Sequence, residues 1–196
     1  MARKLHYFLI YKPYKVLSQF SDEDGNSGLG SVFKLPKGVY PVGRLDLDSE
    51  GLLILTNDKS LNHRLLDPKH GHKRTYWVEV EGKPTKDELE QLRVGVDINV
   101  NGKKHHTLPA EVEIIGPTIP EREPPVNRIK HPETSWMSIS LTEGKNRQVR
   151  KMTAKVGHPT LRLLRVGIES LNLFPMEPGD LRMISRNVLY KKLGLE

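Results

Sequence analysis

The apolar run Leu-Leu-Ile-Leu-Thr at residues 52–56 limits the fold more than any other segment. A run this short and this apolar is typical of a strand that is covered on both faces of a sheet. Asn57 or Asp58 then caps a helix, which ends before Pro68 because proline cannot continue the backbone hydrogen bonds. The apolar side of this helix consists of Leu61, Leu65 and Leu66. The chain therefore needs a sheet with a buried strand.

Further strands and helices are interspersed along the chain without a regular β-α-β order. Residues 74–81 alternate between apolar and polar side chains as a strand does, and Thr85 with Glu88 forms a capping box for the helix before Gly95. Other strands are expected at 5–11, 110–115, 136–141 and within 161–174, and a helix at 147–156. This order predicts an α+β fold with a central mixed or antiparallel sheet and flanking helices.

Two polar segments interrupt this pattern. Residues 19–38 are a loop with a short helical turn, and their glycines do not have the spacing of a phosphate-binding loop. Residues 116–134 contain five prolines and form either a surface excursion or a link between subdomains. With 196 residues, the chain is expected to be a single domain over 1–196, in one lobe or two.

The composition excludes several classes of protein. The chain has no cysteine, so disulfides, thiolate metal sites and a catalytic Cys are excluded. No apolar run approaches the roughly 18 residues of a membrane span, and no cleavage site follows the apolar N-terminal stretch, which predicts a cytoplasmic protein without a membrane partner. His70 with His72, and His105 with His106, lack the spacing of a metal site, and no cofactor motif is present.

The net charge of +7 is concentrated in the second part of the chain. Residues 1–127 carry 18 basic and 18 acidic side chains, whereas residues 128–196 carry 13 basic and 6 acidic ones. Such an asymmetry favours a face that binds a polyanion, and a basic surface that merely keeps the protein in solution is the alternative.

Two segments carry candidate chemistry. Asp46, Asp48 and Glu50 directly precede the buried strand, where a loop can carry catalytic groups. The alternative is that Asp48, Ser49 and Glu50 form a solvated turn that leads into the strand. In the helix at 147–156, Val149, Met152 and Val156 face the core, and the opposite side carries Arg147, Lys151 and Lys155. This basic side fits phosphate binding or a solvated helix face. Tyr76 and Trp77 either stack on bases or belong to the core.

The run GRLDLDSEGLLILTND at 43–58 resembles the catalytic motif of the RsuA-like branch of bacterial pseudouridine synthases. KRTYWVEVEG at 73–82 and EGKNRQVRKMTAKVGHPTLRLLRVGI at 143–168 resemble the second and third motifs of this family. The opening YKPYKVLSQFSDEDG and the proline-rich stretch resemble those synthases of the branch that act on 23S (large subunit) ribosomal RNA. The resemblance spans nearly the whole chain, but the first catalytic strand begins near Leu5, so we expect no N-terminal S4 domain.

The resemblance implies a pseudouridine synthase fold with an RNA-binding cleft, and an isomerase that needs no cofactor and no metal. It implies Asp46 as the catalytic carboxylate, Tyr76 as a contact of the target base and Arg150 as the partner that keeps Asp46 charged. Arg44, Arg147, Lys151 and Arg165 are candidates for binding the RNA backbone. Leu163 or Leu164 either forms an apolar wall of the pocket or is an ordinary core leucine.

The expected substrate is a uridine of 23S ribosomal RNA, free or in a ribosome assembly intermediate, and the enzyme is expected to act as a monomer. Three alternatives stay open: a synthase for another ribosomal RNA site, a catalytically silent RNA-binding protein on the same scaffold, and a glycosidase or nuclease that pairs Asp46 with Asp48 or Glu50.

Overall fold

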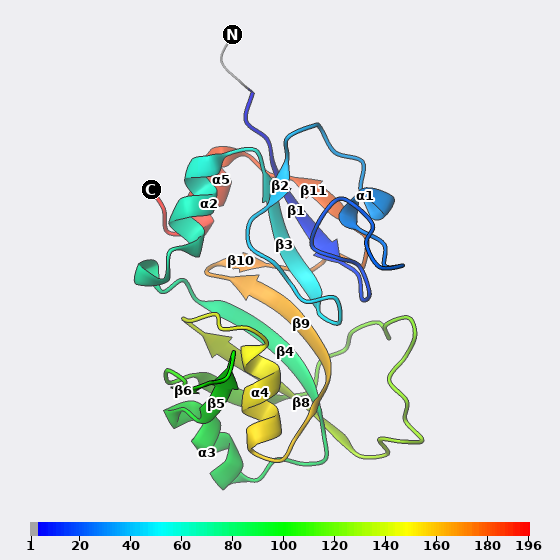
Figure 1. Ribbon diagram of the computed structural model, residues 1–196, viewed down its shortest axis with the longest axis vertical. Coiled ribbons are helices and arrows are strands. Elements are labelled where there is room, and N and C mark those ends of the chain that lie inside the picture. Colours follow the sequence, from blue (N-terminus) through cyan, green and yellow to red (C-terminus); the bar gives the residue numbers. More distant parts are fainter. Residues whose placement is uncertain (1–3) are drawn as a thin grey trace. The chain divides into compact units, whose positions relative to one another are not determined.

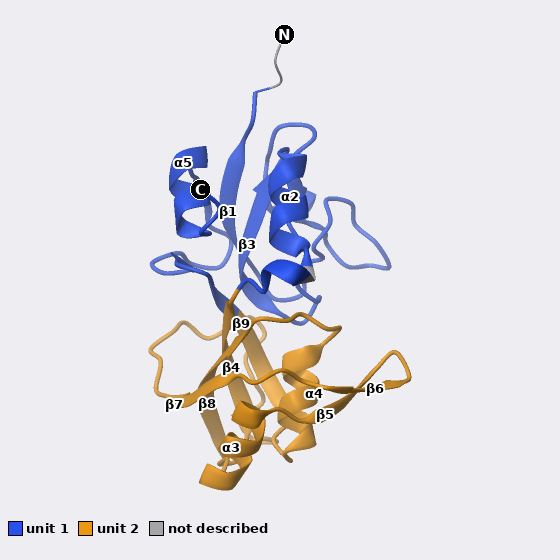
Figure 2. Cartoon of the chain, turned by 90° about the vertical axis from the view of Figure 1, so that its left-hand side faces the viewer, with its two compact units in different colours: residues 1–72, 165–196 blue, residues 73–164 orange. Residues whose placement is uncertain are grey.

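The computed structural model describes residues 4–196, which form two compact units (Figures 1 and 2). Unit 1 combines the N-terminal segment up to His72 with the C-terminal segment Arg165–Glu196, and unit 2 is Lys73–Leu164. Strand β9 (Thr160–Ile168) contributes its first five residues to unit 2 and its last four to unit 1. The proline-rich segment 116–134 lies inside unit 2, so it does not link the two units.

The sheet of unit 1 has the strand order β11-β1-β3-β9. Strand β1 (Tyr7–Lys12) is antiparallel to both β3 (Glu50–Thr56) and β11 (Leu181–Met183). All seven residues of β3 are buried, so the expectation for the apolar run at 52–56 is confirmed. The remaining elements of unit 1 are α1 (Leu29–Val32), β2 (Tyr40–Pro41), α2 (Lys59–Leu66), η1 (Pro68–His70), β10 (Leu171–Asn172) and α5 (Arg186–Lys192).

Asp58 is the N-cap of α2, and it also joins this helix to β1 and α5. Its Oδ1 accepts hydrogen bonds from the backbone of Ser60 and Leu61, and its Oδ2 accepts one of 2.7 Å from the Tyr7 hydroxyl and one of 2.8 Å from the Tyr190 hydroxyl. Burial raises the pKa of Asp58, but these hydrogen bonds outweigh it and hold the pKa below its usual range. The cap therefore belongs to the core of unit 1.

One expectation for α2 is wrong. Leu61 and Leu65 are buried as predicted, but Leu66 is 42% exposed. Leu66 is the last helical residue, and Asp67 follows in an extended conformation. Because the helix ends at Leu66, this side chain does not pack fully into the core.

The sheet of unit 2 has the strand order β9-β4-β8-β7, and α3 and α4 pack against it. Strand β8 (Thr134–Leu141) is antiparallel to β4 (Arg74–Glu81) and to β7 (Glu111–Ile115). Leu89 and Leu92 of α3 (Lys86–Val94) lie in the core, together with residues of α4 (Gln148–Lys155). The α4 residues are Val149 and Met152, and Val156 follows as the C-cap.

The sequence patterns missed a hairpin in unit 2 and the elements after β10. Strands β5 (Asp97–Val100) and β6 (Lys103–His106) are polar, and only Ile98 is buried. Their turn residues Asn101 and Gly102 both have positive φ, of 52° and 80°. Asn-Gly is a strong hairpin signal because such turns need positive φ at both positions, so the hairpin could have been predicted.

The architecture confirms the expected α+β class, because helices and strands alternate irregularly around a mixed sheet. No helix within residues 4–196 has both the length and the apolar character that a membrane crossing requires.

Candidate active site

The turn that carries Asp46 is fixed on several sides in unit 1. Gly43 begins it with a φ of 73°, and the Asp46 carbonyl accepts a hydrogen bond of 3.0 Å from the amide of Ser49. The Ser18 hydroxyl donates to the Leu45 carbonyl at 2.8 Å and accepts from the Leu45 amide at 3.0 Å. Leu45 is buried, whereas Asp46 is half-buried. The carboxylate thus stands on a backbone with little freedom, as a preorganised catalytic group requires.

Strand β3 and the last part of β9 approach each other closely at Gly51, directly after the acidic turn. Gly51 has a φ of 107°, and a Cβ atom at this position would lie 2.3 Å from the carbonyl oxygen of Arg165. Only glycine accepts both this φ and this distance. The glycine of the run GRLDLDSEG therefore sets the spacing between β3 and β9.

The interpretation of Asp48, Ser49 and Glu50 as a solvated turn is wrong for two of these three residues. Ser49 is 2% exposed and Glu50 is 1% exposed, and Glu50 is the first residue of β3. Asp48 is half-buried. Glu50 is buried because it is part of the sheet: it belongs to β3, which pairs with β1 as far as the adjacent residue Gly51.

A buried lysine, which the sequence patterns did not indicate, lies near these acids. Lys12 is 0% exposed, and its Nζ donates to the carbonyl oxygens of Val16 at 2.6 Å and Pro13 at 2.9 Å. Burial lowers the pKa of Lys12 to about 8, and the negative charges of Glu50, Asp48 and Asp46 oppose this shift. Lys12 thus supplies a positive charge, within unit 1, to the surroundings of the segment that carries Asp46.

Tyr76 lies in the middle of β4 in unit 2, opposite Ile139 of β8. It is half-buried, and its ring packs against the hydrophobic core. Its hydroxyl has no hydrogen-bond partner within residues 4–196. The body of the side chain therefore stabilises the unit, and the polar end is available to a ligand.

Helix α4 holds the other predicted residues of unit 2. Arg147 is its exposed N-cap, with a φ of 52°, and Arg150 is half-buried and donates from Nη1 to the Thr160 carbonyl at 3.4 Å. Gln148 is buried and donates to Oε1 of Glu143 at 2.6 Å, and its own Oε1 accepts from the Lys145 amide at 2.9 Å. Gln148 thus fixes the start of the helix, a role that the sequence patterns did not indicate.

The basic side of α4 faces the hairpin that the sequence patterns missed. A groove of about 710 Å³ lies between them, and Lys151, Lys155 and Lys104 line it. On the hairpin, Asp97 binds Lys104 at 2.8 Å. The groove therefore has a positive excess, as a phosphate-binding surface has.

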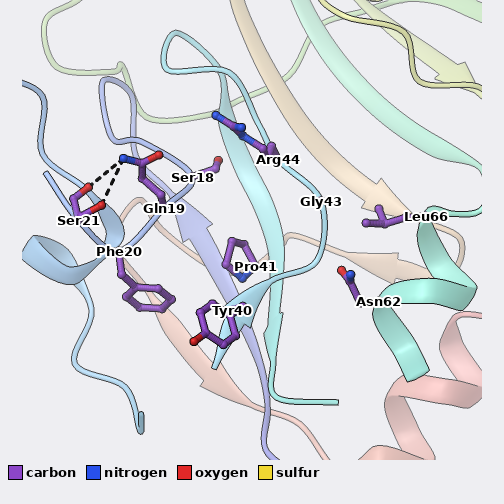
Figure 3. A pocket seen from close by; sticks show the side chains of 10 residues that line it. All are labelled: Ser18, Gln19, Phe20, Ser21, Tyr40, Pro41, Gly43, Arg44, Asn62 and Leu66. Atoms are coloured by element: carbon purple, nitrogen blue, oxygen red, sulfur yellow. Dashed lines mark hydrogen bonds between the residues drawn. The ribbon is translucent and has the colours of Figure 1, made fainter. Parts of the chain in front are cut away.

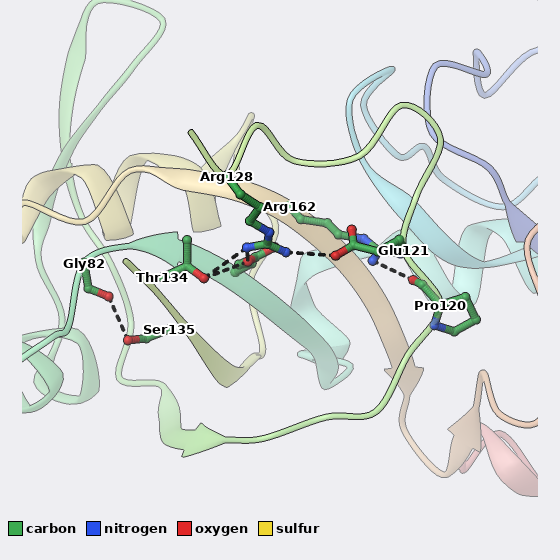
Figure 4. Close-up of polar contacts among 8 residues, drawn as sticks. Gly82, Pro120, Glu121, Arg128, Thr134, Ser135 and Arg162 are labelled. Carbon is green, nitrogen blue, oxygen red and sulfur yellow. Dashed lines mark hydrogen bonds and ion pairs between the residues drawn. The ribbon is translucent and has the colours of Figure 1, made fainter. Parts of the chain in front are cut away.

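The proline-rich segment is tied to the sheet of unit 2 by arginines (Figure 4). Arg128 forms an ion pair with the buried Glu79 of β4 and a hydrogen bond of 3.1 Å with Glu121. Arg162 of β9 is buried and donates to the Pro120 carbonyl at 2.8 Å. The surface excursion is thus anchored at two of its sites.

The remaining predicted residues have contrasting environments. Arg44 is exposed in unit 1, whereas Arg165 is 5% exposed and donates from Nε to the Leu52 carbonyl at 2.8 Å. Leu163 belongs to the core of unit 2, and Leu164 is fully buried. This burial favours the open alternative of ordinary core leucines.

The family described as RNA pseudouridylate synthase matches residues 6–155 of this chain. The chain belongs to this family. It is accordingly an RNA pseudouridine synthase, an isomerase. The matched range contains Asp46, Tyr76 and Arg150, and it also contains Lys12.

Two curated relatives and one solved structure place the synthase more closely. Ribosomal large subunit pseudouridine synthase E of Vibrio parahaemolyticus serotype O3:K6 is 48% identical over 174 residues, which cover 88% of this chain and 71% of the relative. The protein of the same name from Xanthomonas campestris pv. campestris is 49% identical over 178 residues, which cover 89% of this chain and 93% of the relative. A crystal structure of a pseudouridylate synthase matches with a TM-score of 0.79 and 25% identity, and it covers 97% of this chain and 75% of that one.

Proposed function

We propose that this synthase converts one uridine of 23S ribosomal RNA into pseudouridine, with Asp46 as its catalytic carboxylate. Both relatives reported above are named as synthases of the ribosomal large subunit, and each is about half identical to this chain over most of its length. The basic groove between α4 and the β5-β6 hairpin fits a polyanionic substrate. The enzyme acts in the cytoplasm as a monomer, on free RNA or on an assembly intermediate.

The reaction is an isomerisation, so it needs positioning and a carboxylate. The N1–C1′ bond of the uridine breaks, the uracil rotates, and a C5–C1′ bond forms while the C5 proton leaves and N1 gains one. Asp46 attacks C1′, adds to the base, or removes a sugar proton to give a glycal. All three routes begin with an ionised carboxylate on a rigid turn, and the hydrogen bonds of Leu45 and Ser49 support such a turn.

Tyr76 and Arg150 complete the proposed chemistry. A target base in RNA is normally stacked, so the nucleotide must leave the stack before it can react. Tyr76 then contacts the uracil, and its hydroxyl, which has no partner within residues 4–196, assists the removal of the C5 proton. Arg150 is proposed to act as the cationic partner of the Asp46 carboxylate during the reaction.

The other candidates divide according to their exposure. Arg44 and Arg147 are exposed, and Lys151 lines the basic groove, so these three bind the RNA backbone. Arg165 is buried against Leu52, and we assign it the positioning of β3 instead. Leu163 and Leu164 support the site from within the core.

The test is an assay of 23S ribosomal RNA fragments with the wild-type enzyme and two matched variants. We expect the wild type to form pseudouridine without release of a base and without strand scission. Asp46→Asn should abolish conversion, whereas Asp48→Asn should retain most of it. Full activity of Asp46→Asn would refute the assignment.

The same assay separates the alternatives. A glycosidase or nuclease that pairs two carboxylates would release uracil or cut the strand, and it would lose activity in both variants. A catalytically silent RNA-binding protein would bind each fragment and convert none. Conversion of small-subunit fragments alone would place the target in another ribosomal RNA.

A further inference from the structure

Unit 1 contains a pocket in which Arg44 is the one lining residue with a role proposed above (Figure 3). Its volume is about 660 Å³. Two aromatic rings, Phe20 and Tyr40, line it together with Pro41 of β2, and Asn62 and Leu66 come from α2. Its other lining residues are Ser18, Gln19, Ser21, Gly43 and Arg44.

The two rings belong to parts of unit 1 that the fold holds in place. Tyr40 is the first residue of β2 and pairs with Thr56 of β3, yet it is 66% exposed. The backbone of Phe20 is fixed by Gly30, whose amide donates to the Phe20 carbonyl at 3.2 Å and whose Cβ, if present, would lie 2.6 Å from that oxygen. The protein thus presents two aromatic faces that its own core does not cover completely, which is typical of a stacking platform.

Polar groups without partners accompany these rings. Within residues 4–196, the side-chain amide of Asn62 and the hydroxyl of Tyr40 have no hydrogen-bond partner, and the exposed Arg44 has no ion pair. Gln19, by contrast, is held by Ser21 and Glu23. An aromatic face, an amide and a guanidinium group match the face, the edge and the phosphate of a nucleotide.

The pocket is adjacent in the chain to the turn of Asp46. Ser18 lines the pocket and also forms both hydrogen bonds with Leu45. Arg44 precedes Asp46 by two residues, so their Cα atoms are at most about 7 Å apart. An occupant of the pocket is therefore close to the carboxylate that acts on the RNA.

We propose that this pocket binds the base of an unpaired nucleotide that neighbours the target uridine, with Tyr40 and Phe20 stacking on it. This inference deepens the proposed function and rests on it, since it assigns a second subsite for the same RNA. Such a subsite contributes to the choice of uridine, because it requires an unstacked base next to the target.

The test combines Tyr40 variants with abasic RNA. In a 23S fragment that the wild type converts, each nucleotide from three before to three after the target is replaced in turn by an abasic residue. We expect one position at which base removal lowers kcat/KM of the wild type about tenfold. With Tyr40→Ala, kcat/KM for the intact RNA should fall by the same factor, and base removal at that position should have no further effect.

Control variants separate stacking from general damage. Tyr40→Phe keeps the ring and should keep the response to the abasic position, and Met183→Ala, an exposed apolar change outside the pocket, should behave as the wild type. Equal losses for wild type and Tyr40→Ala at all positions would overturn the inference.

If the wild type converts no 23S fragment, the proposed substrate is wrong, and a binding measurement then tests the pocket by itself. The affinity for a single-stranded RNA oligonucleotide is then compared between wild type, Tyr40→Phe and Tyr40→Ala. A weaker affinity for Tyr40→Ala alone would support the pocket as a base-binding site, and equal affinities would overturn it.

Discussion

The ammonium group of Lys12 lies 2.6 Å from the carbonyl oxygen of Val16, in the interior of unit 1. A buried ammonium is costly unless hydrogen bonds and negative charges compensate it. Here two carbonyl oxygens accept its protons, and Glu50, Asp48 and Asp46 supply the charge. Lys12 therefore joins the end of β1 to the segment that carries Asp46.

The stability of the protein should depend on the titration of Lys12. Its pKa is about 8 in the folded protein and 10.5 ordinarily, so between these values the unfolded state binds more protons. The free energy of unfolding must then rise with pH across this window, by roughly 2 kcal/mol up to about pH 9.5. Denaturant unfolding of wild type and Lys12→Met at about pH 7 and 9.5 measures the effect. A difference between the two proteins that does not change with pH would contradict it.

The Asp58 network should contribute measurably to stability. Tyr190→Phe removes a buried hydrogen bond to a carboxylate, which should lower the free energy of unfolding by about 2 kcal/mol at neutral pH. Because the pKa of Asp58 is lowered, this loss should shrink as the pH falls and the carboxylate becomes protonated. Tyr40→Phe is the control, since that hydroxyl has no partner within residues 4–196. Equal effects of both substitutions would argue against the network.

Arg150 and Arg147 should affect different kinetic constants. If Arg150 assists the proposed catalytic carboxylate of Asp46 in the transition state, Arg150→Met should reduce kcat roughly a hundredfold with little change in KM. Arg147→Met removes an exposed cation at the N-terminus of α4 and should mainly raise KM. Steady-state kinetics on the same RNA fragment compare the two. A variant of Arg150 that altered only KM would reassign this residue to RNA binding.

Lys151 should contribute to RNA affinity through one phosphate contact. Lys151→Ala should weaken binding, reduce the slope of log affinity against log salt by about 1, and leave single-turnover conversion at saturating enzyme unchanged. Lys86→Ala, which removes an exposed lysine of α3 outside the groove, is the matched control. Identical salt slopes for wild type and Lys151→Ala would exclude the contact.

Local sequence patterns predicted the helices and strands that are specified by residues close to one another in the chain. The buried run at 52–56, a helix cap at Asn57 or Asp58, and the capping box of Thr85 and Glu88 were all predicted, because caps and periodic burial are local properties. The structure selects Asp58 as the cap. The hairpin at 97–106 could also have been predicted from Asn101 and Gly102, but its strands are polar and lack the apolar pattern of a strand. The carboxylate at position 46 was recognised only because its motif is long and resembles a known family.

The sequence alone determined the α+β class and the family, and it supplied the candidates for the catalytic residues. The tertiary structure decided which of these side chains are buried and what surrounds them: Lys12 and Glu50 inside unit 1, Arg165 against Leu52, and the pocket between Phe20, Tyr40 and α2. The reason is physical. Burial and electrostatic environment depend on residues brought together from distant parts of the chain, and no local pattern of one sequence specifies those neighbours.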